Sequence, residues 1–213
     1  LKIFKNLTKK FIFLCFARGL CFLFMNVFYF IAINNMDFAT ASTLTFSATF
    51  FIVILSIFFL NDKVGIYRWS AVIIGFIGVA MIMKPTSDIF SYYSIYPLMV
   101  GLLYAIAIII LKFIPKYNST AKIQFYSLIA SIIGAMILLS ITLDNKFIEN
   151  YIDLLMLISI GILGGAAGIL FIYSYRLIEA SKLAVFEYLA IPSSFFLGWF
   201  FFDEAPIDQL FPG

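Results

Sequence analysis

The sequence predicts an all-α membrane protein, a polytopic helical bundle with seven membrane spans. Hydrophobic residues make up 64% of the 213-residue chain and charged residues only 12%, which is about half the charged share of a soluble domain. The apolar residues form continuous runs rather than alternating ones, which favours helices over barrel strands. Each run is long enough to cross a hydrocarbon core about 30 Å thick.

The seven predicted spans follow one another through short connections, so no soluble domain interrupts the bundle. In chain order they cover about 11–33, 38–60, 66–83, 93–114, 119–142, 154–175 and 183–202. We number them from the first to the seventh.

The placement of basic residues predicts the side that each connection faces. Lysines crowd residues 1–10, before the first span, and a basic flank of this kind marks the cytoplasmic side of a membrane. Threading the spans from there leaves only Lys84 and Lys146 on the opposite side. The cytoplasmic set is Lys2, Lys5, Lys9, Lys10, Lys63, Arg68, Lys112, Lys116, Lys122, Arg176 and Lys182. We expect a multi-pass protein of a bacterial inner (plasma) membrane.

The first span carries three candidate substrate-binding residues. Arg18 and Tyr29 lie on one stripe of this helix, with Asn26 on the edge of the stripe. Arg18 lies about 10 Å into the span from its cytoplasmic end. Its guanidinium either reaches back to the membrane interface as an anchor, or it anchors a substrate or pairs with Glu187.

The second and seventh spans carry polar faces in the same register. Glu187 and Ser194 lie near one line of the seventh span, and Thr45 and Thr49 lie on the matching stripe of the second. We interpret these faces as opposing walls of one substrate cavity. Hydroxyls that bond back to helix carbonyls or hold helices together are the alternative. Tyr104 in the fourth span is a further aromatic candidate.

Glu187 is the strongest single candidate. A charge near the bilayer centre costs about 2.5–3.5 kcal/mol or more, so such residues usually face a cavity or a partner. Pro192 cannot donate a hydrogen bond, which frees the carbonyl of Tyr188 next to Glu187. A carboxylate, a free carbonyl and a phenol within one turn predict a site for a cation, an amine or a coupled proton. A structural pair with a neighbouring helix is the alternative.

Small residues four positions apart predict close helix packing, because they let backbones approach one another in lipid. The pairs are Ala71/Gly75 in the third span, Ala130/Gly134 in the fifth, and Gly161/Gly165 and Gly164/Gly168 in the sixth. We therefore expect these three spans to make close helix–helix contacts.

An internal repeat is indicated by a shift of 142 residues, which places Asp62 on Glu204 and the second span on the seventh. The charge rule puts these two acidic residues on opposite sides of the membrane, so the two copies run in opposite directions. Inverted repeats are frequent in secondary transporters, with the substrate near the midplane. We predict that residues 1–83 are the C-terminal part of the first repeat, with three helices. Residues 84–213 are the second repeat, with four helices and the start of a fifth.

The repeat also predicts a longer parent protein. The third span should have a partner at about 208–225, beyond Gly213, and two helices of the second copy have no counterpart in the first. We expect ten spans in two sets of five in the intact protein. By itself the present chain would then be an inactive fragment of such a protein.

These features resemble the drug/metabolite transporter superfamily, in its EamA-like branch. The stretches that carry the resemblance are Arg18-Gly19, Leu60-Asn61-Asp62-Lys63, Ala184-Val185-Phe186-Glu187-Tyr188 and Gly198-Trp199-Phe200-Phe201-Phe202-Asp203-Glu204-Ala205-Pro206. The resemblance implies a ten-helix carrier of metabolites, amino acids or drugs, of which the present spans are the third to the ninth. The family often has a proline in the helix that matches the second span, where Thr49 or Phe50 stands here. The Phe186-Glu187-Tyr188 version is similar to subgroups that include S-adenosylmethionine uptake carriers.

We therefore expect a secondary transporter of a small metabolite (an amino acid, amine, drug or nucleoside-type solute) that works by alternating access. The sequence has no histidine and no phosphate-binding Gly-x-x-x-x-Gly-Lys loop, which disfavours an enzyme and ATP drive. A membrane receptor is disfavoured by the repeat. The expected partners are the substrate, a coupled proton and the lipid bilayer, with no cofactor, metal or nucleic acid. A homodimer, the transport direction and the substrate identity stay open.

Overall fold

The structure, a computed structural model, describes residues 8–36, 38–83, 91–142, 151–193, 196 and 200. None of these residues lies in a strand. Within them, five helical segments are long and apolar enough to cross a bilayer, namely Lys9–Asn35, Thr40–Leu60, Tyr92–Phe113, Thr120–Ser140 and Leu154–Leu177. The prediction of an all-α, polytopic membrane protein is confirmed.

Most predicted spans correspond to single helices. These are α1 (Lys9–Asn35), α4 (Ile66–Met83), α5 (Ile95–Phe113, preceded by the short 3-10 turn η3, Tyr92–Ser94), α6 (Thr120–Thr142) and α7 (Tyr151–Leu177). The apolar stretch of α4 is shorter than that of the five long segments. The seventh span begins as α8 (Ala180–Ala184) and continues as the 3-10 helix η4 (Val185–Leu189), while most of its second half lies outside the described residues.

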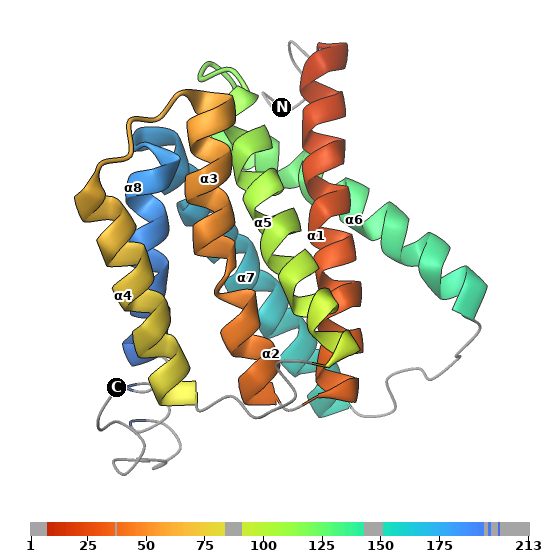
Figure 1. Cartoon of the computed structure of the whole chain (residues 1–213). Coiled ribbons are helices and arrows are strands. Elements are labelled where there is room, and N and C mark those ends of the chain that lie inside the picture. The colour runs from red at the N-terminus through yellow and green to blue at the C-terminus, as the bar shows by residue number, and fades with distance from the viewer. Residues whose placement is uncertain are drawn as a thin grey trace.

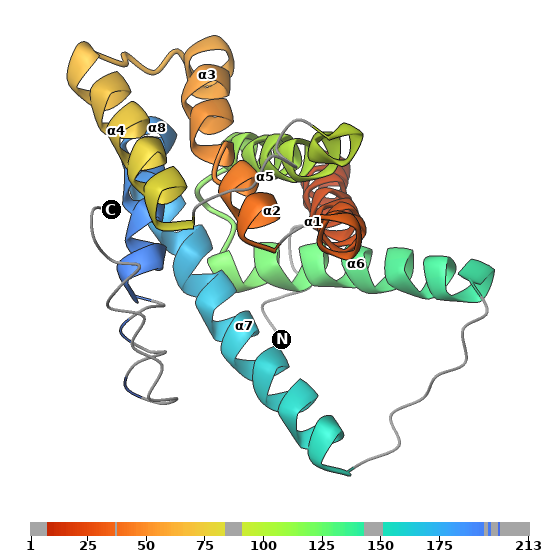
Figure 2. The ribbon, with the colours of Figure 1, turned by 60° about the horizontal axis from the view of Figure 1, so that its bottom comes forward.

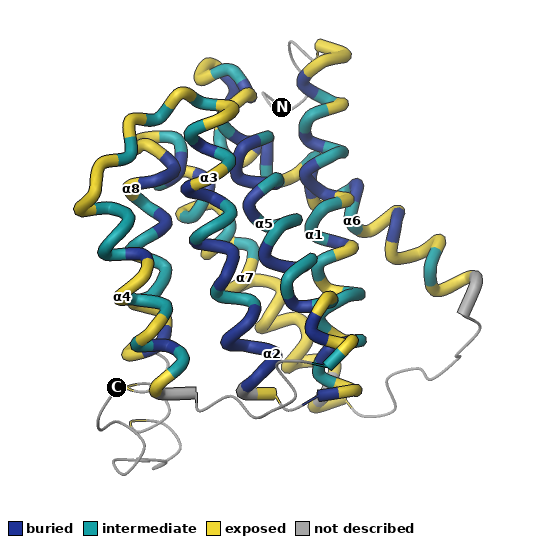
Figure 3. Tube along the Cα trace, viewed as in Figure 1, coloured by how far each residue is buried: buried dark blue, intermediate teal, exposed yellow. Residues whose placement is uncertain are grey.

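Helix α5 lies in the middle of the bundle, between α1 and α3, and α7 crosses behind it (Figure 1). Its side chains Ala105, Ile108 and Leu111 are almost fully buried. The tube coloured by burial shows the same pattern, with buried residues concentrated along α3 and α5 (Figure 3). The bundle is therefore organised around α5.

The two long helices α6 and α7 diverge from each other, with α6 lying along α1 (Figure 2). The first half of α7 is exposed, including Leu155, Ile160 and Leu163. Exposed apolar side chains of this kind face hydrocarbon in a membrane protein, where every backbone polar group is already paired within the helix.

The small-residue prediction holds at two helix contacts and fails in most of α7. A Cβ at Gly19 would meet the Ser127 carbonyl oxygen and the Ala130 side chain, and one at Gly134 would meet Leu23, so α1 and α6 pack backbone to backbone. Gly75 of α4 likewise lies against the Tyr188 ring. In α7, by contrast, a Cβ at Gly161, Gly164 or Gly165 meets nothing within 4 Å among the described residues, and only Gly168 approaches another helix, at Gln124.

The second predicted span is broken in the middle. It forms α2 (Phe38–Thr45) and α3 (Ala48–Leu60), separated by a turn at Phe46 and Ser47. Thr45 Oγ1 donates to the Ala41 carbonyl at 2.9 Å, a side-chain bond that competes with regular helix geometry. Helix α5 approaches the turn closely, because a Cβ at Gly101 would lie 2.9 Å from both Ser47 Oγ and the Ala48 nitrogen. A kink therefore forms here without a proline.

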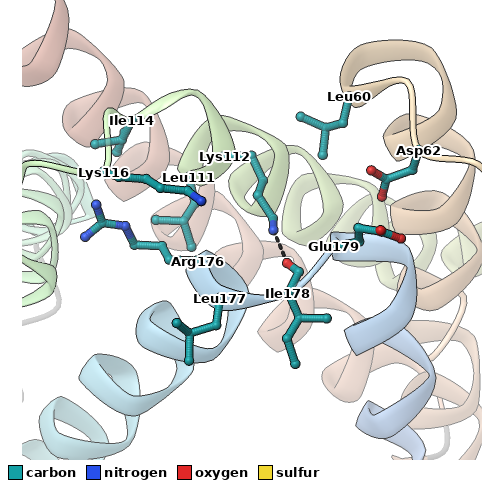
Figure 4. Close-up of a pocket in the computed structure, with 10 residues that line it drawn as sticks. All are labelled: Leu60, Asp62, Leu111, Lys112, Ile114, Lys116, Arg176, Leu177, Ile178 and Glu179. Carbon is teal, nitrogen blue, oxygen red and sulfur yellow. Dashed lines mark hydrogen bonds between the residues drawn. The ribbon is translucent and has the colours of Figure 1, made fainter.

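The connections that were predicted to share one side of the membrane do meet at one end of the bundle. Arg176 at the end of α7 donates to the Asn118 carbonyl at 2.6 Å and to the Pro115 carbonyl at 3.1 Å. Lys112 donates to the Ile178 carbonyl, and these residues border a cavity of about 310 Å³ (Figure 4).

The acidic residues of the same end are already paired. Glu179 lies 3.0 Å from both Arg68 and Lys182, and the Lys182 hydrogen bond is the main cause that lowers the pKa of the Glu179 carboxyl. Asp62 accepts from the Ser181 hydroxyl at 3.0 Å. The connection after α3 is thus tied to the connection after α7.

Candidate functional site

Glu187 joins three helical elements through its carboxylate. It lies half-buried in η4, and its Oε1 accepts a hydrogen bond from the Tyr104 hydroxyl of α5 at 2.9 Å. The Tyr175 hydroxyl of α7 donates to the same oxygen. Hydrogen bonds to an ionised acceptor are stronger than neutral ones, so two phenols fix the carboxylate in place. Its described partners are therefore neutral donors, and none of them is a basic residue.

Two cavities open on Glu187. One, of about 430 Å³, is also bordered by Phe171, Tyr175 and Phe186. The other, of about 210 Å³, is bordered by Thr45 and Thr49. Glu187 thus faces space on two sides, as the sequence predicts for a functional carboxylate.

Thr45 and Thr49 line the same cavity as Glu187, which agrees with their predicted positions on facing helices. Both line the smaller cavity, and Thr49 is only 1% exposed. The break between α2 and α3 lies between these two residues, which places the turn in the wall of the cavity. The matching polar faces of the second and seventh spans are thus brought together in this structure.

Tyr104 belongs to both Glu187 cavities and to a third cavity of about 480 Å³. The third cavity lies between α1, α6 and α7, and Arg18 and Asn26 line it. The structure describes no ion pair between Arg18 and Glu187, so the predicted pairing of these two residues is not found there. Tyr104 and Phe171 both line the Arg18 cavity and a Glu187 cavity, so these two aromatic side chains lie between the two regions.

The remaining predicted residues lie elsewhere. Tyr188 points to α4, where its hydroxyl donates to the Val72 carbonyl at 3.1 Å, and its ring stacks on Phe46. The Tyr29 hydroxyl lies 3.4 Å from Ser42 Oγ on α2. Asn26 lines the third cavity but donates its amide to the Phe22 carbonyl at 2.8 Å. Ser194 lies outside the described residues.

The sequence analysis missed several residues that border the site, of which Tyr175 is the most important. Tyr175 is fully buried and bonds Glu187, but it lies on the preceding helix, where no helical spacing relates the two. Phe171, Gln124, Ser127 and Ser131 also line the cavities. Gln124, Ser127 and Ser131 follow one another at spacing i, i+3 and i+7 on α6, so helical periodicity was the signal that could have identified them.

The described residues hold no group of three or more histidine, cysteine or acidic side chains that could bind a metal ion. The site is instead a carboxylate, two phenols and a guanidinium around three neighbouring cavities. Such groups can bind a charged organic solute or hold a proton.

Replacing Tyr104 with Phe should lower the efficiency of any function of Glu187 by about tenfold, since one hydrogen bond to a charged group is worth about 1.5–3 kcal/mol. The ring would still fill the space between the cavities. The initial rate of the intact protein's activity, compared between the variant and the native protein, measures the effect. Tyr173→Phe is the matched control, because Tyr173 is 55% exposed on the outer face of α7. Equal rates for both variants would show that the Tyr104 bond has no role.

Comparison with known proteins finds that the chain is similar to several transporters. Residues 1–84 match the EamA-like transporter family. The chain is 26% identical to the S-adenosylmethionine uptake transporter of Rickettsia bellii over 189 residues. This aligned stretch covers 89% of the present chain and 64% of that protein. It is 26% identical over 185 residues to the riboflavin transporter of Brucella anthropi (85% and 65%). It is 28% identical over 196 residues to the pseudopaline exporter CntI of Pseudomonas aeruginosa (89% and 66%). The chain thus spans just under two thirds of the length of these relatives.

Proposed function

We propose, from the match of residues 1–84 to the EamA-like transporter family, that the intact protein is a secondary transporter of a small metabolite. The observation that carries the proposal is the position of Glu187, a carboxylate within a membrane bundle that faces two cavities and is fixed by Tyr104 and Tyr175. Intramembrane carboxylates of this kind mark substrate and proton pathways.

Two related breaks in the helices support an inverted repeat. The turn at Phe46 and Ser47 falls, after a shift of 142 residues, on Tyr188 and Leu189, which belong to the 3-10 helix η4. Both copies therefore depart from α-helical geometry at the same position. Discontinuous helices at corresponding positions of two repeats line the binding site in many secondary transporters.

A contact between equivalent residues gives further support. Phe46 and Tyr188 occupy the same position in the two copies, and their rings stack with centroids 6.0 Å apart and 29° between the planes. Residues that a two-fold axis interchanges can touch one another only near that axis. The neighbouring equivalents, Thr45 and Glu187, line one cavity. We therefore propose a pseudo-two-fold axis beside the substrate site, with residues 1–83 and 84–213 in opposite repeats.

We propose that this arrangement supports alternating access. The two repeats rock against one another near Phe46 and Tyr188. The broken helices bend to accommodate the change in the relative orientation of the repeats. Glu187 holds either a cationic group of the substrate or a coupled proton. The relatives carry S-adenosylmethionine, riboflavin or pseudopaline by their names, so a metabolite of similar size is the substrate class that we propose. We propose no enzymatic activity for the chain.

The test is uptake by the intact protein in proteoliposomes, with a panel of radiolabelled amino acids, nucleosides, flavins and S-adenosylmethionine. Counterflow of at least one solute, without ATP, is the expected result. Protein-free liposomes are the control. Failure to exchange any panel member above that control would contradict secondary transport of a small metabolite. The 213-residue chain tested beside the intact protein shows whether it is active by itself.

The orientation is proposed from the basic end of the bundle, which we place in the cytoplasm together with residues 1–10. Lys116 is exposed at that end, beside Arg176. A Lys116→Cys variant should react with a membrane-impermeant maleimide in inverted vesicles and stay unlabelled in intact cells. Labelling in intact cells would reverse the topology.

A further inference from the structure

Arg18 is a buried cation inside the membrane bundle. Its residue is only 3% exposed, although it lies in the middle of a long, largely apolar helix. It lines the cavity of about 480 Å³ between α1, α6 and α7. Its role is not explained by the site at Glu187, which lines other cavities.

The guanidinium points into the membrane rather than back to its basic end. Its central carbon lies 4.6 Å from the centre of the Phe22 ring, and Phe22 is one turn deeper along α1. Asn26, a further turn along, lines the same cavity. The alternative that Arg18 reaches back to the interface as an anchor requires the opposite direction, because α1 starts at the basic end with Lys9.

No counter-charge accompanies Arg18 in the part of the chain that the structure describes. The ion pairs found there involve Arg68 and Lys182, and the residues that line the Arg18 cavity include no acid. The Arg18 Nε is buried without a hydrogen-bond partner among the described residues, and so is the hydroxyl of Ser127, which lines the same cavity from α6. A buried charge or polar group without a partner is strongly unfavourable.

An anion in the cavity would offer acceptors to the Arg18 guanidinium and, after rotation of its side chain, to the Ser127 hydroxyl. A guanidinium presents a planar fork of donors that matches a carboxylate or a phosphate through two parallel hydrogen bonds. The remaining walls are partly polar, with Gln124 and Ser127, and partly aromatic, with Phe22 and Phe171. A single cation balances a carboxylate fully, whereas a phosphate dianion would leave one buried negative charge.

We propose that this cavity is the subsite for the carboxylate of an organic substrate, held by Arg18 and Ser127, with the apolar part of the substrate against Phe22 and Phe171. This inference rests on the proposed transport function and narrows its substrate class to carboxylic acids and zwitterions. Tyr104 lines both this cavity and those of Glu187, so the two charged residues line neighbouring cavities on either side of one aromatic wall.

The test is ligand-induced thermal stabilisation of the purified intact protein in detergent. The probes are 3-phenylpropionate, its neutral amide and phenylphosphonate. A ligand that binds only the folded state raises the unfolding temperature in a concentration-dependent way. We expect the carboxylate to stabilise the protein, and the amide to have no effect. Arg18→Gln should weaken the carboxylate effect by at least about tenfold.

Two further variants keep the test decisive if Arg18→Gln does not fold. Arg18→Lys should retain part of the carboxylate effect, and Ser127→Ala should weaken it about threefold. Arg68→Gln, which changes a basic residue at the end of the bundle, is the control and should respond as the native protein does. Equal stabilisation by acid and amide, an unchanged response in both Arg18→Lys and Ser127→Ala, or no response of the native protein would overturn the subsite. Stronger stabilisation by phenylphosphonate would overturn its assignment to carboxylates.

The binding test and the transport test separate the two proposals. Stabilisation that depends on Arg18, without counterflow of any solute, would support the subsite and reject transport. Counterflow that is unchanged by Arg18→Lys and Ser127→Ala, with no carboxylate effect, would support transport and reject the subsite.

Discussion

Substitution of Glu187 by Gln is expected to reduce transport by the intact protein about 100-fold, equivalent to about 2.7 kcal/mol. The amide keeps the size of the side chain and its oxygen still accepts from Tyr104 and Tyr175, so the fold should survive. Only the negative charge and the proton-binding capacity are lost. A charge-assisted contact to a substrate cation is worth an energy of this order.

Comparing counterflow with uptake driven by a pH gradient distinguishes the two proposed roles of Glu187, binding of a substrate cation and binding of a coupled proton. If the carboxylate binds a cationic group of the substrate, both counterflow and uptake driven by a pH gradient should disappear in Glu187→Gln. If it carries a coupled proton, uptake driven by a pH gradient should disappear while counterflow persists. Both assays use the same proteoliposomes.

Glu179→Gln is the matched control for this variant. Glu179 lies eight residues earlier, is exposed, and pairs with Arg68 and Lys182 at the end of the bundle. Exposed ion pairs contribute little to stability, so this variant should transport as the native protein does. Native rates in Glu187→Gln as well would make Glu187 a structural residue.

Substitution of Gly19 by Ala is expected to destabilise the bundle by about 1–3 kcal/mol, the usual range for overpacking. The added Cβ would overlap the Ser127 carbonyl oxygen, which is backbone and cannot turn away. Helices α1 and α6 must then separate. The bond from Ser131 Oγ to the Gly19 carbonyl, 2.8 Å long, would be strained at the same time.

Thermal unfolding in detergent measures this effect. Gly161→Ala is the control, because a Cβ there meets nothing within 4 Å among the described residues. It lies on a helix of similar composition and changes the chain by the same methyl group. Equal unfolding temperatures for the two variants would show that α1 and α6 do not pack as closely as described.

The sequence predicted what depends on composition and on periodicity along one helix. Long apolar runs and few charges suffice for the membrane class, since the hydrocarbon core sets the span length. Glu187 stood out because a charge is costly in such a run. Thr45 and Thr49 were identified because helical spacing places them on one stripe, and the structure turns that stripe toward Glu187.

Only the tertiary structure decided what depends on how helices lie against one another. Tyr175 donates a hydrogen bond to Glu187, whereas Tyr188, which follows Glu187 directly in the sequence, turns its hydroxyl to the Val72 carbonyl of α4. The break at Phe46 needs no proline, because it arises where Gly101 of α5 lies against Ser47 and Ala48. The direction of Arg18 likewise followed from its contact with Phe22. Periodicity defines which residues share a face of a helix, whereas the rotation and crossing of neighbouring helices decide what that face meets, and those depend on contacts between residues far apart in the chain.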